Sequence, residues 1–195
     1  MSKTAAVGSR ASALPPDERR AAIVEATKPL LFECGEAVTT RQIAVAAGVA
    51  EGTIFRVFAD KDELLVATLE SLVDLTDFED AVRSIDAALS FEDQLVAVVT
   101  LVRQRIADVW RVFSNVSPKL REQASRPIAD SDAVTELCAA HAHLLSVAPQ
   151  RAARLVRALT LSVTHPMIAP ESMGADEIVD VLLRGIEVRA GGAPA

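Results

Sequence analysis

Apolar residues recur every three or four positions along most of the chain, a pattern typical of amphipathic α-helices. The first such segment places one face on Ile23, Ala26, Leu30, Leu31 and Cys34. It begins after the helix-start signal Pro15-Pro16-Asp17 and stops at Gly35, a residue favoured just past a helix end. Pro29 lies inside the segment and is expected to kink the helix near Glu25, because proline removes one backbone hydrogen bond.

The next segment predicts two short helices joined by a tight turn. Thr39 and Gln42 form a capping box, in which each side chain satisfies a backbone amide at the start of the first helix. That helix is expected to end at Gly48, and the second to cover residues 51–58. Ala50 is a poor N-cap for the second helix. Two short helices with a glycine-containing turn are the local signature of a helix-turn-helix.

The rest of the chain predicts further helices. Asp60 is expected to cap a long helix that continues through Val73. The other expected helices cover residues 77–89, 91–115, 130–147, 149–163 and 175–188, and residues 117–127 are expected to form a connection. No segment alternates apolar and polar residues over the length of a strand. The predicted fold class is therefore all-α, with an N-terminal three-helix helix-turn-helix domain followed by a larger helical domain.

Composition and charge narrow the class of protein. A chain of 195 residues, half of them hydrophobic, can bury a core without disulfides or metals. Cys34 and Cys138 lack the spacing of a metal site and are expected to be buried thiols in a reducing compartment. No apolar run approaches the ~18 residues of a membrane span. We therefore expect a soluble, cytoplasmic protein with no cofactor and no membrane partner.

The net charge of −7 argues at first against a nucleic-acid partner, because such proteins usually carry a basic surface. The segment 17–62 is not basic either. Phosphate contacts, however, need only a few well-placed cations and backbone amides. Net charge therefore does not exclude DNA, but a dimer and the N-terminal arm would have to add affinity.

The stretch 38–65, VTTRQIAVAAGVAEGTIFRVFADKDELL, resembles the helix-turn-helix signature of the TetR family of bacterial regulators. The match consists of a threonine-rich helix start, the Ala47-Gly48-Val49 turn, Gly52-Thr53-Ile54 opening the second helix, Phe58, and Lys61 before an acidic residue and two leucines. The resemblance implies a homodimer that binds a two-fold symmetric operator in double-stranded DNA. It also implies a helical C-terminal domain that binds a small-molecule effector and then releases the DNA. The expected domains are a flexible arm over 1–16, the DNA-binding domain over 17–63, the ligand-binding and dimerisation domain over 64–190 and a tail over 191–195.

The expected DNA contacts lie at the starts of the two short helices. Thr40 and Arg41 stand at the positive end of a helix dipole, where a hydroxyl can hold a phosphate and a guanidinium can reach a guanine. Gly52 lets the second helix approach the groove closely. The candidate DNA-binding residues are Thr40, Arg41, Glu51, Gly52, Thr53, Phe55, Arg56 and Lys61. The simpler alternatives are that Gly52 only packs and that Lys61 is only solvated.

Two positions depart from the family pattern. Phe55 stands where the family usually has tyrosine, so the hydroxyl that commonly bonds a phosphate is missing. Val57 stands where histidine is common. We therefore expect weaker anchoring to the backbone, with Arg56 or the N-terminal arm as replacements.

An aromatic stripe suggests a ligand site in the apolar half. Trp110 and Phe113 share one helical face with Ile106 one turn earlier, with Gln104, Asn115, Cys138 and His141 as polar company. The candidate ligand-binding residues are Leu69, Leu72, Ile106, Trp110, Phe113, Cys138 and His141. A neutral or weakly charged apolar ligand is expected, because no cluster of buried charge is evident. Ordinary core packing is the alternative, and His141 and His143, two apart on a helix, are expected to face different directions and to form no metal pair.

Two late helices carry apolar stripes that the resemblance assigns to a dimer interface. The candidate interface residues are Leu155, Leu159, Ile178, Leu182 and Ile186. Packing within one chain is the alternative for any of them. A helical interaction module without DNA binding remains a second function, and an α-helical enzyme a third. No nucleophile–base pair, acid pair or cofactor loop supports catalysis, so we assign no catalytic residue.

Overall fold

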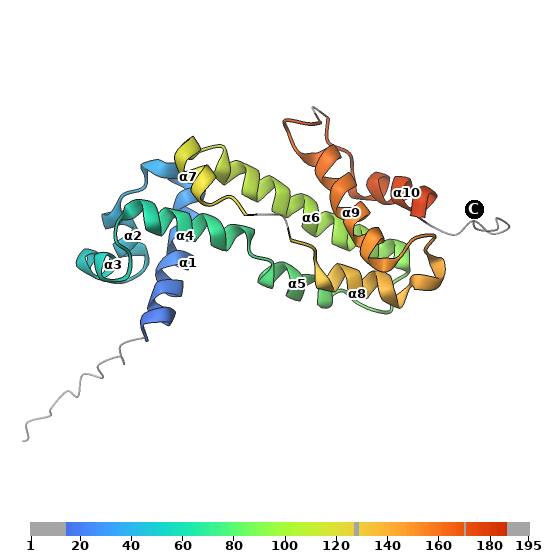
Figure 1. Ribbon diagram of the computed structural model, residues 1–195, viewed down its shortest axis with the longest axis horizontal. Coiled ribbons are helices and arrows are strands. Elements are labelled where there is room, and N and C mark those ends of the chain that lie inside the picture. Colours follow the sequence, from blue (N-terminus) through green and yellow to red (C-terminus); the bar gives the residue numbers. More distant parts are fainter. Residues whose placement is uncertain (1–14, 127–128, 170, 187–195) are drawn as a thin grey trace, which may run out of the picture. The chain divides into compact units, whose positions relative to one another are not determined.

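The computed structural model describes residues 15–126, 129–169 and 171–186, and every regular element in these ranges is a helix (Figure 1). This confirms the predicted all-α class. The chain divides into two compact units, residues 1–68 and 69–195, and the division falls inside helix α4 (Lys61–Val73). Each unit has its own buried apolar core.

The first unit is built from α1 (Pro16–Cys34), the 3-10 helix η1 (Gly35–Ala37), α2 (Thr40–Ala46), α3 (Glu51–Val57) and the beginning of α4. Helix α1 packs against α2 and α3, and α2 packs against α3. The core of this unit consists of Ile23, Val24, Leu31, Val38, Ile43, Ala44, Ile54, Phe58, Leu64 and Leu65. Ile23 and Leu31 of the predicted α1 face belong to this core, whereas Ala26 and Leu30 are half-buried and Cys34 is exposed.

Local sequence signals set the ends of these helices. The capping box is present, because the Thr39 hydroxyl accepts the Gln42 amide while the Gln42 side chain accepts the Thr39 amide. Gly48 turns the chain between α2 and α3 with a φ of 65°, a conformation that glycine adopts without steric cost. Asp60 accepts the Glu63 amide at the start of α4, as predicted. Ala50 provides no side-chain cap for α3, also as predicted.

Arg20 joins three segments of the first unit. Its Nη1 donates to the backbone carbonyl of Val57, at the end of α3, over 3.0 Å. Its Nη2 forms an ion pair with Glu63 of α4 at 3.0 Å. The guanidinium also lies 4.2 Å from the centre of the Phe58 ring. One side chain of α1 therefore fixes the end of α3 and the start of α4.

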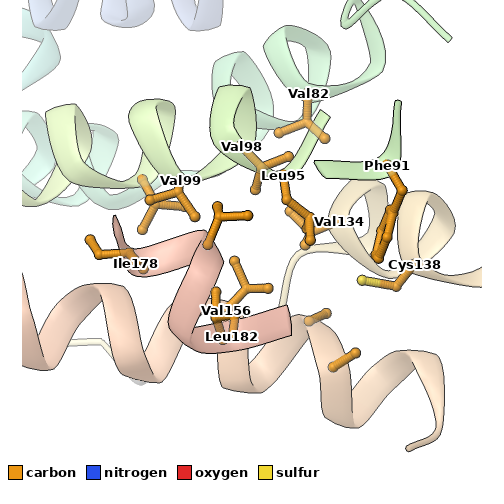
Figure 2. Close-up of a cluster of buried hydrophobic side chains, with 14 of the residues drawn as sticks. Val82, Phe91, Leu95, Val98, Val99, Val134, Cys138, Val156, Ile178 and Leu182 are labelled. Carbon is orange, nitrogen blue, oxygen red and sulfur yellow. The ribbon is translucent and has the colours of Figure 1, made fainter. Parts of the chain in front are cut away.

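The second unit contains α5 (Thr76–Arg83), α6 (Phe91–Phe113), α7 (Pro118–Gln123), α8 (Asp132–Ala140), η2 (Ala142–Leu144), α9 (Pro149–Thr164) and α10 (Ala175–Ile186). The long helix α6 packs against α9 and α10, and α8 packs against α9 and α5 (Figure 1). Figure 2 shows the core between them, with Leu95, Val98 and Val99 of α6 facing Val156 of α9 and Ile178 of α10.

Several helix bounds differ from the sequence prediction. Helix α5 ends at Arg83 rather than at residue 89, and the Asp86 carboxylate accepts the Ala88 amide in a turn beyond it. The expected connection over 117–127 contains the short helix α7, which Ser117 caps by accepting the Leu120 amide. Helix α8 is shorter than predicted and ends at Ala140. Asp, Ser and other short polar side chains compete for backbone groups, which explains why periodicity alone misplaced these ends.

Two further expectations need correction, and a third is not tested. Cys34 is exposed, whereas Cys138 is buried as predicted. His141 ends α8 and His143 lies in η2, so the two rings stack with centroids 6.5 Å apart instead of facing apart on one helix. Helix α1 runs through Pro29 without interruption, and the predicted kink stays a prediction.

Candidate nucleic-acid interface and ligand cavity

The first turns of α2 and α3 are linked by a hydrogen bond between two candidate DNA-binding residues. The Thr40 hydroxyl donates to a carboxylate oxygen of Glu51, with 2.5 Å between the oxygens. Thr40 begins α2 and Glu51 begins α3, so this bond holds the two helix starts together. Thr53, one turn into α3, is half-buried. The polar groups predicted to meet DNA are therefore gathered at the two helix N-termini, where backbone amides favour an anion.

The outer surface of α2 and α3 carries exposed cations and exposed apolar side chains. Arg41 and Arg56 are exposed and make no hydrogen bond or ion pair within the described residues. Phe55 is 51% exposed and Val45 77% exposed, although both are large hydrophobic residues. A surface that combines free guanidinium groups with exposed apolar side chains suits the phosphates and thymine methyl groups of a DNA groove.

Gly52 faces open space in the part of the chain that the structure describes. A Cβ atom built on it would meet no atom within 4 Å. The sequence left open whether this glycine only packs, and the surrounding space argues against that alternative.

Lys61 is half-buried at the start of α4. Its ammonium group donates to the backbone carbonyl of Glu36 over 2.7 Å. The lysine predicted to contact phosphate therefore has a hydrogen-bond partner within the protein. The alternative that its charge is only solvated does not hold.

The second unit contains a cavity of about 540 Å³. Most of its wall is apolar, and Ile106, Trp110 and Phe113 of α6 all line it. The Trp110 ring packs edge-on against His165, with centroids 4.5 Å apart. The remaining wall comes from Val73, Leu75, Phe78, Val102, Arg105, Val109, Arg121, Arg126, Ala129, Asp130, Ser131, Val134, Ala153, Val156, Arg157, Leu161 and Ile168.

The other candidate ligand residues do not line this cavity. Cys138 is fully buried in the core beside Phe91 (Figure 2), and burial raises the pKa of its thiol to about 11. His141 stacks on Phe91, 4.7 Å between ring centres. Leu69 is buried and Leu72 half-buried, and neither is part of the wall. The prediction that these four residues bind the ligand does not hold for this cavity. Residues that recur along one helical face can equally pack into the core.

Gln104 and Asn115, named as polar company for the aromatic stripe, are exposed and lie outside the wall. Gln104 instead donates to Asp108 on its own helix. The cavity's polar groups are mainly arginines, which sequence reasoning missed. Helical spacing could have predicted Arg105, which lies four residues before Val109 and eight before Phe113 and therefore shares their helical face.

Arg105 is half-buried in the cavity wall. Burial lowers the pKa of its guanidinium below the ordinary value, and the negative charges of Asp74 and Asp77 counteract that in part. The group stays protonated, since arginine does not deprotonate in proteins. By contrast, Asp130 is paired with Arg154 and Arg157, and the hydrogen bond from Arg154 is the main cause that lowers the pKa of this carboxyl.

The predicted dimer stripes are mostly used within the chain. Ile178 is fully buried and Leu182 is buried in the core, so neither lies on a surface that a second copy could cover. Leu159 is half-buried against the same core. Leu155 of α9 is 39% exposed and Val181 of α10, which was not among the predicted residues, is 42% exposed. The side chain of Ile186 lies outside the described part of the chain.

Comparisons with known proteins agree with this geometry. Residues 23–68 match the family model described as bacterial regulatory proteins, tetR family. The HTH-type transcriptional repressor Rv3405c of Mycobacterium tuberculosis is 33% identical over 149 residues, covering 74% of this chain and 78% of the relative. An HTH-type transcriptional regulator of Mycobacterium bovis matches with the same identity and coverage.

Solved structures show the same fold. A transcriptional regulator of the TetR/AcrR family from Thermobifida fusca has a TM-score of 0.52 at 24% identity, covering 86% of this chain and 95% of that one. NalD, the secondary repressor of the MexAB-OprM multidrug efflux pump in Pseudomonas aeruginosa, has a TM-score of 0.51 at 22% identity, covering 90% and 100%. Within the described ranges no helix is both long and apolar enough to cross a membrane. The chain belongs to the tetR family of bacterial regulatory proteins and is a DNA-binding transcriptional regulator rather than an enzyme.

Proposed function

We propose that this regulator is a repressor that binds its operator as a homodimer and leaves it when an apolar small molecule occupies the cavity of the second unit. The observation that carries the proposal is the cavity itself. Its volume of about 540 Å³ falls in the range of small-molecule sites, and its wall combines a tryptophan and a phenylalanine with a few polar groups. Repression is supported by the name of a relative that is 33% identical.

The proposed DNA contacts follow from the surface of α2 and α3. Helix α3 enters the major groove, where Gly52 permits close approach and Arg56 reaches along the groove. Arg41 reads a base edge, and Thr40 and Lys61 bind phosphates. The remaining candidates, Glu51, Thr53 and Phe55, lie within or beside this surface. The absence of packing around Gly52 and of partners for both arginines in the described residues supports this assignment.

Release requires that the effector bind one conformation of the dimer better than another. A ligand shifts an equilibrium only through a difference in its affinity for the two states. Helix α4 is the element through which the signal passes, because it is one continuous helix across the division between the units. Its first residue, Lys61, belongs to the proposed DNA surface, and its last residue, Val73, lines the cavity.

The homodimer is supported by exposed apolar residues on the last two helices. Leu155 and Val181 are large hydrophobic side chains left open to solvent in the single chain. A palindromic operator needs two recognition helices about one helical turn of DNA apart, which only a dimer supplies. Leu155→Glu combined with Val181→Glu is expected to give a monomer that loses operator binding. Ala139→Glu combined with Ala140→Glu adds the same two negative charges at exposed sites of α8 and serves as the control. Sedimentation that shows the parent monomeric at micromolar concentration would refute the dimer.

One titration tests repressor release. Fluorescence anisotropy of the DNA upstream of the gene is expected to show sequence-specific binding, and compounds that raise the melting temperature are expected to reverse it. Trp110 is the only tryptophan in the chain, so its fluorescence reports the cavity directly. Compounds that release DNA should change this fluorescence and should bind less tightly to Trp110→Ala and Phe113→Ala variants. Release with unchanged fluorescence and unchanged affinity for both variants would contradict the proposed site.

A further inference from the structure

The cavity carries more positive charge than an uncharged effector requires. Its charged wall residues are four arginines and a single carboxylate, namely Arg105, Arg121, Arg126, Arg157 and Asp130. Two of the arginines are neutralised by ion pairs, Arg157 with Asp130 at 3.0 Å and Arg126 with Glu70. The sequence had predicted a cavity without a cluster of charge, so the arginines revise the expected ligand.

The other two arginines have no carboxylate partner in the part of the chain that is described. Arg121 is exposed, and its Nη2 donates to the backbone carbonyl of Val116 over 3.1 Å. Arg105 is half-buried, and its guanidinium makes no hydrogen bond or ion pair there. Its nearest aromatic neighbour is the Phe78 ring, 6.0 Å away, which is at the outer limit of a cation–π contact.

A half-buried guanidinium has given up part of its hydration, and Arg105 gains no hydrogen-bond acceptor from the described residues in return, so an anion that binds it is favoured. Its planar fork fits a carboxylate in two parallel hydrogen bonds. Arg121 is exposed, so water screens its charge, and Arg105 is the half-buried arginine of the wall that lacks an ion pair with a described residue. A singly charged carboxylate matches this one guanidinium better than a doubly charged phosphate does. Binding such a group would satisfy Arg105 and would fix the position of the molecule that carries it.

We infer that the effector of this regulator has an apolar body bearing a single carboxylate, which Arg105 binds while Trp110 and Phe113 contact the apolar body. Arg105 and Phe113 are eight residues apart on α6, or about 12 Å along the helix axis at the usual rise per residue. A body of medium length therefore reaches both. This inference rests on the proposed function, because it takes the cavity to be the effector site.

A matched panel of probes tests it. Decanoic acid, decan-1-ol and decylamine share one apolar body, and 4-phenylbutyric acid, 4-phenylbutan-1-ol and 4-phenylbutylamine share another. Affinity is measured by the change in Trp110 fluorescence and by operator release. For each body the acid is expected to bind at least about tenfold more tightly than the alcohol, the gain typical of a charge-assisted hydrogen bond, and the amine least tightly.

Variants then identify the residue responsible. Arg105→Met is expected to abolish the preference for the acid while keeping the affinity for the alcohol, and Arg105→Lys to keep part of the preference. Arg111→Met removes the same charge from an exposed position of α6 outside the cavity wall and should change neither affinity. Circular dichroism and the melting temperature without ligand establish that each variant folds.

The outcomes separate this inference from the proposed function. If alcohols bind and release DNA as well as the acids do, or if the acid preference persists in Arg105→Met, the carboxylate assignment is wrong while the effector cavity stands. If no member of either series binds or releases DNA, the carboxylate assignment falls and the proposed apolar effector cavity falls with it.

Discussion

The Thr40 hydroxyl and the Glu51 carboxylate share a hydrogen bond of 2.5 Å between the starts of α2 and α3. The group proposed to bind a DNA phosphate is therefore occupied by an anion in the free protein. A phosphate that replaces Glu51 at this hydroxyl must also approach its negative charge, which costs Coulomb energy. Glu51 thus holds the two helix starts together, and in the proposed complex we expect its charge to oppose the DNA backbone.

Glu51→Gln is expected to raise affinity for specific and unrelated DNA alike, by about two- to tenfold at low salt, because it removes a negative charge near the phosphates and keeps an acceptor for Thr40. Anisotropy titrations over a range of salt concentrations measure the effect. Glu33→Gln removes the same charge from an exposed position of α1 and serves as the control. An unchanged or weaker affinity in Glu51→Gln would contradict the repulsive role.

Gly52→Ala is expected to weaken operator binding by more than about tenfold while leaving the protein at least as stable. Alanine is favoured over glycine inside a helix by up to about 1 kcal/mol, and the added methyl group meets no atom of the described residues within 4 Å. Only the DNA groove would be obstructed by it. Gly174→Ala adds the same methyl group to open space in the second unit and should leave operator affinity unchanged. Equal DNA affinity of the parent and Gly52→Ala would show that this glycine does not approach the DNA.

Helix starts were the most predictable part of the fold, because they depend on neighbours in the sequence. Thr39 and Asp60 each cap the helix that the sequence assigned to them. Helix ends without such signals were misplaced, as at Arg83. Periodicity identified a buried face at Ile178 but could not say whether this chain or a second copy covers it.

The candidate sites followed the same rule. The motif placed Thr40 and Glu51 near two helix starts, but not the hydrogen bond between them, which depends on the angle of the turn. The stripe of Ile106, Trp110 and Phe113 was found, since it repeats along one helix. The positive charge of the cavity was not predicted, because the arginines that line it come from α6, α7 and α9, which are far apart in the sequence.

The two cysteines are expected to differ in reactivity. Cys34 is exposed and Cys138 is buried, with a pKa raised to about 11, so at pH 8 iodoacetamide should modify the first and spare the second. Intact-mass measurements should show one modification in the native protein and two in denaturant. As pH rises above about 9, the Cys138 thiol loses its proton in the unfolded chain before it does so in the folded protein. The free energy of unfolding is therefore expected to fall above about pH 9 and to be unaffected by this thiol below it. Rapid double labelling of the native protein would contradict the burial of Cys138.

Arg20→Met is expected to destabilise the first unit by about 1 to 2 kcal/mol, because it removes the hydrogen bond to the Val57 carbonyl and the contact with the Phe58 ring. Operator affinity should fall as well, since the end of α3 loses its anchor. Arg20→Lys keeps the charge but not the two-armed guanidinium, so it should recover only part of both losses.

The pH dependence of the Arg20 effect distinguishes the ion pair from the other contacts. The pKa of Glu63 is lowered mainly by the hydrogen bond from the Ala59 amide and next by Arg20. A lowered folded-state pKa adds stability above the ordinary value of 4.5, and that stability is lost as pH falls through the lowered pKa. The difference in unfolding free energy between the parent and Arg20→Met, measured in urea, should therefore be larger at pH 7 than at pH 3. It should not vanish at pH 3, because the Val57 carbonyl and the Phe58 ring do not titrate. A difference that is the same at both values would mean that the ion pair with Glu63 contributes nothing.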